Sequence, residues 1–584
     1  MPKQIPLTPS RSNATNECFK WRRSLLSSLH PDDAKLLGAR LSEKDQAFGY
    51  IAANTWLRKV IGRYQLLAKL STLRPVVAKE ANRLAHYLDE ASAYAWLKSV
   101  VQRLQYCDTL ITDLSGDTLA AWAWQKSHGF EVELVKIGTR SNAEAVKAYI
   151  EFHLRQADVD FHNWQDNDKV AGLAARMITA KWWVRQARRQ WIKVEQVLRE
   201  CGQVHKYASP YVSHWSLKKE QQKQANQMAF LEGWEAINDQ GQAYSLAQLA
   251  ELGVASPDKR FAELIVRSRG LEEVAKEQDH DAWFITLTCP SKYHPISQGR
   301  RNHKYRLAKS PTVQEAHAYL NHVWQCFRAW CHRHGIAFYG VRTVEPHHDG
   351  TPHWHLIVYL DKAQSDHFLA AFKRYALAED GQEAGAEKYR FKVLKIVPEK
   401  GTATAYITKH ISKNIHGKYL DTDHETGRSG VDAAKRIVAW ARLNRIKQFQ
   451  FIGGASVTVW RELRRLQIKA APRAFAAIYH AANRADYAAF IKLMGGVFAG
   501  RKQTLVTHYS DPEENQYGEM VKCIKGVAND IEVVITRLYE WRVQRKQLEV
   551  IEETVSELTW TSVNNCTPTQ LLKNAHITNQ AQAN

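Results

Sequence analysis

The sequence predicts an α+β protein in which a central antiparallel sheet carries helices on one face and is flanked by largely helical N- and C-terminal regions. Apolar residues recur at helical spacing from about residue 40 to 199 and again beyond residue 431. Between these regions, strand-like and helical runs follow the order β-α-β-β-α-β-α, which favours an antiparallel sheet with packed helices. With 45% hydrophobic and 24% charged residues, the composition is that of a globular protein.

Local signals place the elements of the strand-containing region. Ser310-Pro311 is a helix start, and Asp349-Gly350 is typical of a tight connection between antiparallel strands. Further along, Ser456 is a suitable N-cap for a helix over 457–466. The expected strands are 283–288, 337–345, 353–360 and 389–397, and the expected helices are 311–335, 361–376 and 402–415.

Composition divides the 584 residues into five segments. The beginning has three prolines among polar residues and is expected to be a flexible leader, whereas the end is rich in Thr, Asn and Gln and is expected to be disordered. The predicted segments are the leader 1–35, a helical basic N-terminal region 36–260, a strand-containing domain 261–425, a basic helical C-terminal region 426–555 and the tail 556–584.

The charge balance favours a polyanionic partner. Lys and Arg total 81 against 60 Asp and Glu, a formal net charge of +21. Phosphates neutralised by such side chains release condensed counterions, which drives binding. Net charge alone does not separate nucleic acid from an anionic membrane surface. No apolar run approaches the roughly 20 residues that span a bilayer, and the scattered cysteines favour a reducing cytoplasm.

Two clusters of basic residues are candidate phosphate contacts. One is interleaved with tryptophans, and the other follows residue 431. Rigid helices that carry Arg and Lys can track a phosphate backbone without reading its sequence, but solvated helix faces give the same pattern. Both interpretations remain open at this stage. The candidates are Arg185, Arg188, Arg189, Lys193, Arg442 and Arg445.

The segment EPHHDGTPHWH contains the strongest chemical signal. Side chains alternate along a strand, so His353 and His355 share one face and Trp354 occupies the other. A hairpin would bring Glu345 on the neighbouring strand against the two imidazoles. Two histidines and one carboxylate form a metal site with open positions. Such a site suits Mg²⁺ or Mn²⁺ acting as a Lewis acid on a phosphate.

A candidate nucleophile follows on the next helix, in YITKHISK. Residues three and four apart share a helix face, so Tyr406, Lys409, His410 and Lys413 are expected to point in similar directions. A tyrosine hydroxyl beside a metal-bound phosphate becomes a nucleophile on deprotonation, and a neighbouring ammonium favours the phenolate. We therefore predict Tyr406 and Lys409 as catalytic residues, with His410 and Lys413 as accessory residues.

A His-hydrophobe-His strand followed by Tyr-x-x-Lys on a helix resembles the HUH endonuclease superfamily of replication initiators, relaxases and transposases. The strand FITLT resembles its first motif, which adds Thr286 and Thr288 as accessory residues. More closely, EPHHDGTPHWH, YITKHISKNI and QFIGGASVTVWRELRR resemble the replication gene A proteins of temperate tailed phages, over about residues 181–466.

This resemblance implies a metal-dependent endonuclease that nicks single-stranded or supercoiled origin DNA to start rolling-circle replication. Tyr406 would form a 5′-phosphotyrosine and leave a free 3′ hydroxyl as primer. The implied partners are a host helicase and a replicative polymerase in the cytoplasm of a bacterial host. A mobilisation relaxase, a transposase and a non-catalytic architectural DNA-binding protein are the alternatives.

The sequence departs from the family at one position. Relatives carry a second tyrosine four residues after the first, and this chain has His410 there. Either one tyrosine suffices, another residue such as Tyr419 substitutes, or replication terminates differently.

Overall fold

The computed structural model describes residues 14–138, 143–466 and 475–546. The chain forms two compact units, Met1–Gln203 and Val204–Asn584. The helical region predicted over 36–260 is divided between them, and its second part also contains two short strands. The predicted tail, 556–584, lies outside the described residues.

The first unit is helical where the sequence predicts helices, from about residue 40 to 199. The predicted leader is wrong for residues 16–27, which form helix α1, and for residues 31–35, which begin helix α2. Thr15 caps this helix by accepting a hydrogen bond from the backbone N–H of Cys18 (3.2 Å), and the buried Arg22 pairs with Asp45 at 2.9 Å. Because a charged arginine occupies a buried position, the spacing of apolar residues does not indicate this helix. The elements are α1 Asn16–Ser27, α2 Pro31–Ala68, α3 Arg74–Tyr87, α4 Glu90–Leu104, β1 Gln105–Tyr106, β2 Thr109–Leu110, α5 Gly116–Gly138, α6 Ala143–Gln156, α7 Asn167–Met177 and α8 Ala180–Glu200.

Helix α8 turns two of its tryptophans inward. Trp182 and Trp183 are buried, and the indole of Trp183 donates to the carbonyl oxygen of Met177 at 2.8 Å. Its ring also meets the edge of Trp122 from α5, with centroids 6.0 Å apart. This tryptophan pair therefore belongs to the core of the first unit rather than to a surface that could stack unpaired bases.

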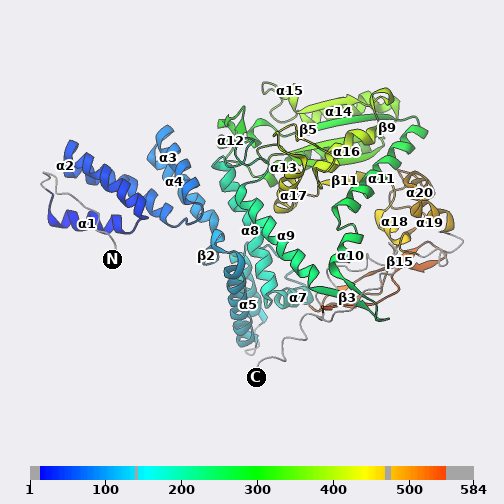
Figure 1. The fold of residues 1–584 in the computed structure, drawn as a ribbon, viewed down its shortest axis with the longest axis horizontal. Coiled ribbons are helices and arrows are strands. Elements are labelled where there is room, and N and C mark those ends of the chain that lie inside the picture. Colours follow the sequence, from blue (N-terminus) through cyan, green and yellow to red (C-terminus); the bar gives the residue numbers. More distant parts are fainter. Residues whose placement is uncertain (1–13, 139–142, 467–474, 547–584) are drawn as a thin grey trace. The chain divides into compact units, whose positions relative to one another are not determined.

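The second unit is built around a five-stranded antiparallel sheet of order β10-β5-β9-β8-β11. Strands β5, β9 and β11 of this sheet are labelled in Figure 1. Every strand predicted between 283 and 397 is present in this sheet. The elements up to residue 463 are α9 His214–Glu232, β3 Trp234–Asn238, β4 Ala243–Ser245, α10 Leu246–Leu252, α11 Pro257–Glu277, β5 Asp281–Thr288, β6 Ile296–Ser297, β7 Arg300–Arg301, α12 His303–Leu307, α13 Val313–Arg333, β8 Phe338–Pro346, β9 Pro352–Leu360, α14 Ser365–Ala376, α15 Ala386–Tyr389, β10 Phe391–Lys395, α16 Ala403–Lys413, α17 Gly430–Asn444, β11 Phe449–Ile452 and α18 Val457–Leu463.

The two faces of the sheet have separate cores. Trp354 and Val344 face a core formed with α13, α14 and α17. Ile357 and Tyr359 face a second core formed with α11, α16 and α18. The α+β class is confirmed, and the helices are distributed over both faces rather than the single face that the sequence predicts. The core with α13, α14 and α17 thus covers one face of the sheet, and α16 packs against the other face.

The C-terminal part differs from the helical region predicted over 426–555. Strand β11 joins the central sheet, and the elements described beyond residue 493 are strands. Ser456 caps α18 as predicted, accepting from the N–H of Val459 at 3.4 Å. Among the described residues, no helix has both the length and the apolar character needed to cross a membrane. The remaining elements are α19 Ala476–Asn483, α20 Tyr487–Leu493, β12 Val506–Tyr509, β13 Glu513–Glu514, β14 Met520–Val521, β15 Ile524–Ala528, β16 Val533–Ile535 and β17 Trp541–Arg545.

Candidate functional site

Strands β8 and β9 bring the three predicted ligands together. In the antiparallel register Glu345 lies opposite His353, and directly paired residues project from the same face. His355 follows two residues later on that face, with its Nε2 3.0 Å from the Nε2 of His353. All three side chains are buried, with 1% to 9% of their surface exposed. Trp354 points into the opposite core, as the alternation predicts.

Helix α16 covers this cluster and is tied to it through Glu345. The Oε1 atom of Glu345 lies 2.8 Å from Nδ1 of His410 and accepts a hydrogen bond from Nδ2 of Asn414, also at 2.8 Å. Its Oε2 atom lies 3.8 Å from the ammonium of Lys413. These three partners are at helical spacings of three and four residues, so they form one face of the helix. A single carboxylate on the sheet therefore fixes the rotation of α16.

The electrostatics of the cluster suit a cation. Burial holds the pKa of His353 and that of His355 well below the ordinary histidine value, so both imidazoles are neutral at pH 7. Burial alone would raise the pKa of Glu345, but His410 and Lys413 outweigh it and hold the pKa well below the ordinary glutamate value. The cluster thus combines neutral imidazole nitrogens with an ionised carboxylate.

Neutral imidazoles and a carboxylate are the donor set of a divalent-metal site. One ligand atom each from Glu345, His355 and His410 lies within 4.8 Å of the other two. The Nε2 of His353 adds a fourth ligand atom at 3.0 Å from His355. On this chemistry, the residues present fit a divalent ion. His410 takes a more central place than the accessory one expected for it.

Lys413 lies in a cage of carboxylates that no pattern in the sequence indicates. Its ammonium is 3.0 Å from Asp423 and 3.8 Å from Glu425, and it lies 5.0 Å from the centre of the Tyr211 ring. Burial alone would lower the pKa of Lys413, but the surrounding carboxylates raise it above the ordinary lysine value. The phenol of Tyr211 donates to Asp423 at 2.5 Å. Lys413 is therefore a fixed positive charge at the site.

The sequence offers little sign of this cage. Asp423 and Glu425 lie in the loop that follows α16, where the sequence has no periodic pattern. Gly417 makes the turn at the start of this loop. Gly417 has φ +68°, and a Cβ there would stand 2.0 Å from the carbonyl oxygen of Gly430. Tyr211 lies 212 positions before Asp423 in the sequence, so no local pattern links the two residues.

The predicted nucleophile lies beside the cluster. The ring of Tyr406 is half-buried and packs near Phe284, with centroids 6.0 Å apart. Phe284 in turn stacks against the imidazole of His355, at 5.4 Å between centroids, and against that of His410, at 5.5 Å. Lys409 is exposed on α16 and does not share the buried face of His410. The four helix residues predicted to point together thus divide into an inner pair, His410 and Lys413, with Tyr406 at the margin and Lys409 outside.

The two accessory threonines have different partners. Oγ1 of Thr286 lies 3.0 Å from Nδ1 of His355 and so fixes the orientation of that ring. Oγ1 of Thr288 donates to the backbone carbonyl of Tyr389 at 2.9 Å. Thr286 is therefore part of the site, and Thr288 instead joins strand β5 to the segment before β10.

The predicted DNA-contacting residues lie on two helices. On α8, Arg185, Arg188 and Arg189 are exposed, and Lys193 pairs with Asp158 at 2.9 Å. At the end of α17, Arg442 pairs with Glu220 at 2.6 Å, and Arg445 has the left-handed backbone conformation of the C-cap. The three exposed arginines of α8 are three and four residues apart, so they share one face of that helix.

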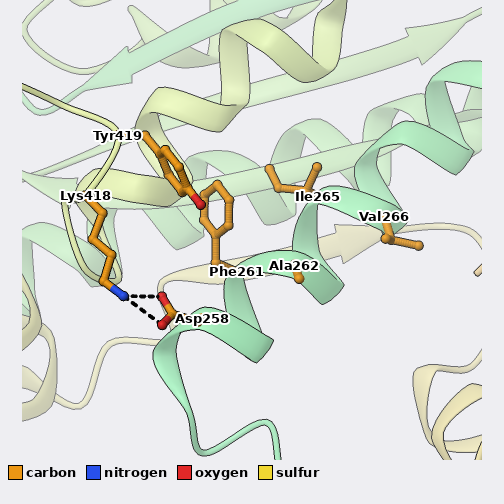
Figure 2. A pocket seen from close by; sticks show the side chains of 7 residues that line it. All are labelled: Asp258, Phe261, Ala262, Ile265, Val266, Lys418 and Tyr419. Atoms are coloured by element: carbon orange, nitrogen blue, oxygen red, sulfur yellow. Dashed lines mark hydrogen bonds and ion pairs between the residues drawn. The ribbon is translucent and has the colours of Figure 1, made fainter.

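Tyr419, considered as a substitute second nucleophile, lines a separate pocket of about 430 Å³ (Figure 2). Its ring lies beside Phe261 of α11, with centroids 4.9 Å apart, and 65% of its surface is exposed. Lys418 and Asp258 close one side of this pocket with an ion pair at 2.7 Å. The group of possible metal ligands contains no residue that lines this pocket.

Comparison with known proteins places the chain among phage and prophage replication proteins. It is 38% identical to the replication gene A protein of Escherichia phage 186, over 68% of this chain and 60% of that protein. It is 32% identical to a probable replication protein of Pseudoalteromonas phage PM2, over 91% of this chain and 81% of that protein. A third relative, named a probable replication endonuclease from a prophage-like region of Salmonella paratyphi A, is 36% identical over 68% of this chain and 53% of that protein.

The chain belongs to the bacteriophage replication gene A protein family, whose model matches residues 135–418. That match includes the whole ligand cluster and helix α16. The chain spans 53% and 60% of the lengths of two of these relatives. No solved structure matches the chain.

Proposed function

We propose that this protein is a site-specific DNA endonuclease of the HUH superfamily, which nicks and rejoins one strand through Tyr406 to initiate rolling-circle replication of phage or prophage DNA. The observation that carries the proposal is the buried cluster of Glu345, His353 and His355 beneath the helix that bears Tyr406. Family membership and the name replication endonuclease of the Salmonella relative support the same activity.

Glu345, His353 and His355 would hold a divalent ion, and the mixed nitrogen and oxygen donors favour Mn²⁺ or Mg²⁺. When bound, such an ion polarises the scissile phosphodiester as a Lewis acid. The sheet contributes rigid placement, since all three ligands lie on paired strands. Thr286 orients His355 by its contact with Nδ1.

In the proposed reaction, the phenol oxygen of Tyr406 forms a bond to phosphorus while the bond from phosphorus to the 3′ oxygen breaks. The phenol loses its proton, and the departing 3′ oxygen gains one. The products are a 5′-phosphotyrosine and a free 3′ hydroxyl. One phosphate ester replaces another, so the reverse attack by a 3′ hydroxyl reseals the strand.

The two lysines of α16 would have different roles. Lys413 is held among carboxylates, so its charge helps His410 to keep Glu345 ionised and is not available to the substrate. Lys409 is exposed one turn after Tyr406 and would contact a DNA phosphate or the developing phenolate. Arg185, Arg188 and Arg189, with Lys193, Arg442 and Arg445, would add phosphate contacts that do not depend on sequence.

The expected substrate is single-stranded or supercoiled origin DNA in the cytoplasm of a bacterial host. A host helicase and a replicative polymerase would extend the 3′ end. A relaxase or transposase built on the same catalytic core is the alternative among enzymes, and a non-catalytic architectural protein is the alternative outside them.

The test uses the supercoiled replicon that encodes this chain, incubated with the protein and Mn²⁺ and then digested with protease. Tyr406→Phe is expected to abolish both the nicked circle and the covalent peptide–DNA adduct. Tyr419→Phe is the matched control, because it removes an exposed tyrosine hydroxyl from a separate pocket, and it should retain both products. An adduct that persists in Tyr406→Phe would refute the assignment, and absence of nicking by the unaltered protein would favour the architectural alternative.

A further inference from the structure

His410 contacts the ligand cluster as closely as the predicted ligands contact one another. Its Nδ1 lies 2.8 Å from Oε1 of Glu345, and the His353 and His355 nitrogens are 3.0 Å apart. Two atoms that bind one octahedral ion side by side, each at about 2.1 Å, are themselves about 3 Å apart. Both contacts therefore have the spacing of atoms that share an ion.

The rings are also arranged to converge. The His410 imidazole lies 4.0 Å from that of His355 between centroids, at an interplanar angle of 37°. Phe284 stacks against both rings from strand β5 and so limits their movement. Glu345, His355 and His410 together form the group whose ligand atoms fall within 4.8 Å of each other.

We propose that His410 is itself a ligand of the active-site ion, so that one ion joins the sheet to the helix that carries the nucleophile. This inference rests on the proposed function. Tyr406 and His410 are one helical turn apart on α16, and Tyr406 is the single tyrosine of that helix. The ion would then hold the helix that carries the one candidate nucleophile of α16.

Two consequences follow for the protein without DNA. Loss of His410 removes a ligand and should weaken Mn²⁺ binding by at least about tenfold, since even the outer partners of metal ligands contribute that much. Ion binding should also protect the backbone amides of α16 from hydrogen exchange, because the ion then clamps the helix to β8 and β9.

The decisive experiment counts the histidine nitrogens that coordinate the ion. Full-length protein labelled with ¹⁵N-histidine is loaded with Mn²⁺, and pulsed electron paramagnetic resonance measures the coupled imidazole nitrogens. His410→Ala is expected to show one coupled nitrogen fewer than the unaltered protein. The matched control is His322→Ala, which removes an exposed histidine of α13 and should change neither the count nor the affinity.

An equal nitrogen count in His410→Ala would overturn the proposal, because His410 would then only donate a hydrogen bond to Glu345. A second variant, His410→Tyr, gives an independent test in the DNA assay, where the nicked circle and the covalent peptide–DNA adduct are both measured. It should weaken Mn²⁺ binding and add a second site of covalent attachment, at residue 410. Adduct formation that survives in Tyr406→Phe would refute the proposed nucleophile while leaving the nitrogen count, and thus the ligand assignment, intact.

Discussion

The side chain of Thr286 contacts the ligand cluster through its Oγ1, which lies 3.0 Å from Nδ1 of His355. Thr286→Val keeps the shape of the side chain and removes this partner, so the imidazole loses its fixed orientation. We expect Mn²⁺ affinity to fall about 10- to 100-fold, measured by titration calorimetry. Thr288→Val removes a hydroxyl from the same strand that bonds Tyr389 instead, and its Mn²⁺ affinity should stay unchanged. Equal losses of Mn²⁺ affinity in the two variants would mean that the substitutions act by disturbing strand β5 rather than by removing the contact with His355.

His317 is a half-buried residue of α13 whose protonation should limit acid stability. Burial lowers its pKa to about 4, with the nearby Arg342 guanidinium acting in the same direction. Since the unfolded chain takes up the proton at about pH 6.5, stability is full above that pH and is lost as the pH falls toward 4. The loss from this group amounts to about 3 kcal/mol at most.

His317→Phe should therefore lose less stability between pH 7 and pH 5 than the unaltered protein, as measured by urea unfolding at both values. His353 and His355 titrate in the same direction but are present in both proteins, so the difference isolates His317. His322→Phe, on the exposed side of the same helix, should behave like the unaltered protein. An identical pH dependence in His317→Phe would show that His317 does not titrate in this range.

At the scale of elements, helix α11 holds the start of α16, the helix that carries Tyr406. Glu272 of α11 accepts hydrogen bonds from the backbone N–H and the hydroxyl of Thr404, at 2.9 and 2.6 Å. A carboxylate at a helix N-terminus satisfies free N–H groups and complements the helix dipole. Glu272→Ala should thus destabilise the protein by about 1–2 kcal/mol and slow adduct formation by Tyr406, two residues further along.

The neighbouring Glu273 provides the control for this prediction. Its side chain is 40% exposed and pairs with the largely exposed Arg269 of α11, so Glu273→Ala should change stability by less than about 0.5 kcal/mol. Urea unfolding and the rate of the covalent adduct are measured for both variants. If the two variants lose activity equally, α11 does not position α16 through Glu272.

The features that the sequence predicts well depend on a strict period or on a local hydrogen bond. His353 and His355 share a face because a strand alternates, and Ser456 caps its helix because a local hydrogen bond suffices. Contacts that depend on distant segments were not accessible in this way. Asp423 reaches Lys413 only after a glycine-dependent turn, and Glu345 bonds Asn414 across 69 positions. Helix α1 was missed for the same reason, since Arg22 depends on Asp45.

For the whole molecule, the net charge of +21 should make DNA binding strongly dependent on salt. The ligand cluster and Tyr406 belong to the second unit, and the exposed arginines of α8 belong to the first. If Arg185, Arg188 and Arg189 contact phosphates, the first unit contributes affinity for DNA and takes no part in the reaction at the second unit. Affinity for DNA and affinity for Mn²⁺ would then be separable by mutation.

The triple variant Arg185→Gln, Arg188→Gln and Arg189→Gln tests this separation. Every arginine that neutralises a phosphate of duplex DNA contributes about 0.9 to the slope of log affinity against log salt, so the slope should fall by up to about 3. Binding to a labelled duplex is measured by fluorescence anisotropy over a range of salt, and Mn²⁺ affinity should stay the same. Lys169→Gln is the matched control, because its ammonium on α7 is paired with Asp166 and it is not among the candidate phosphate contacts, so its removal should change the slope less than that of an exposed arginine. An unchanged slope in the triple variant would mean that these arginines are solvated and that the DNA phosphates bind elsewhere on the protein.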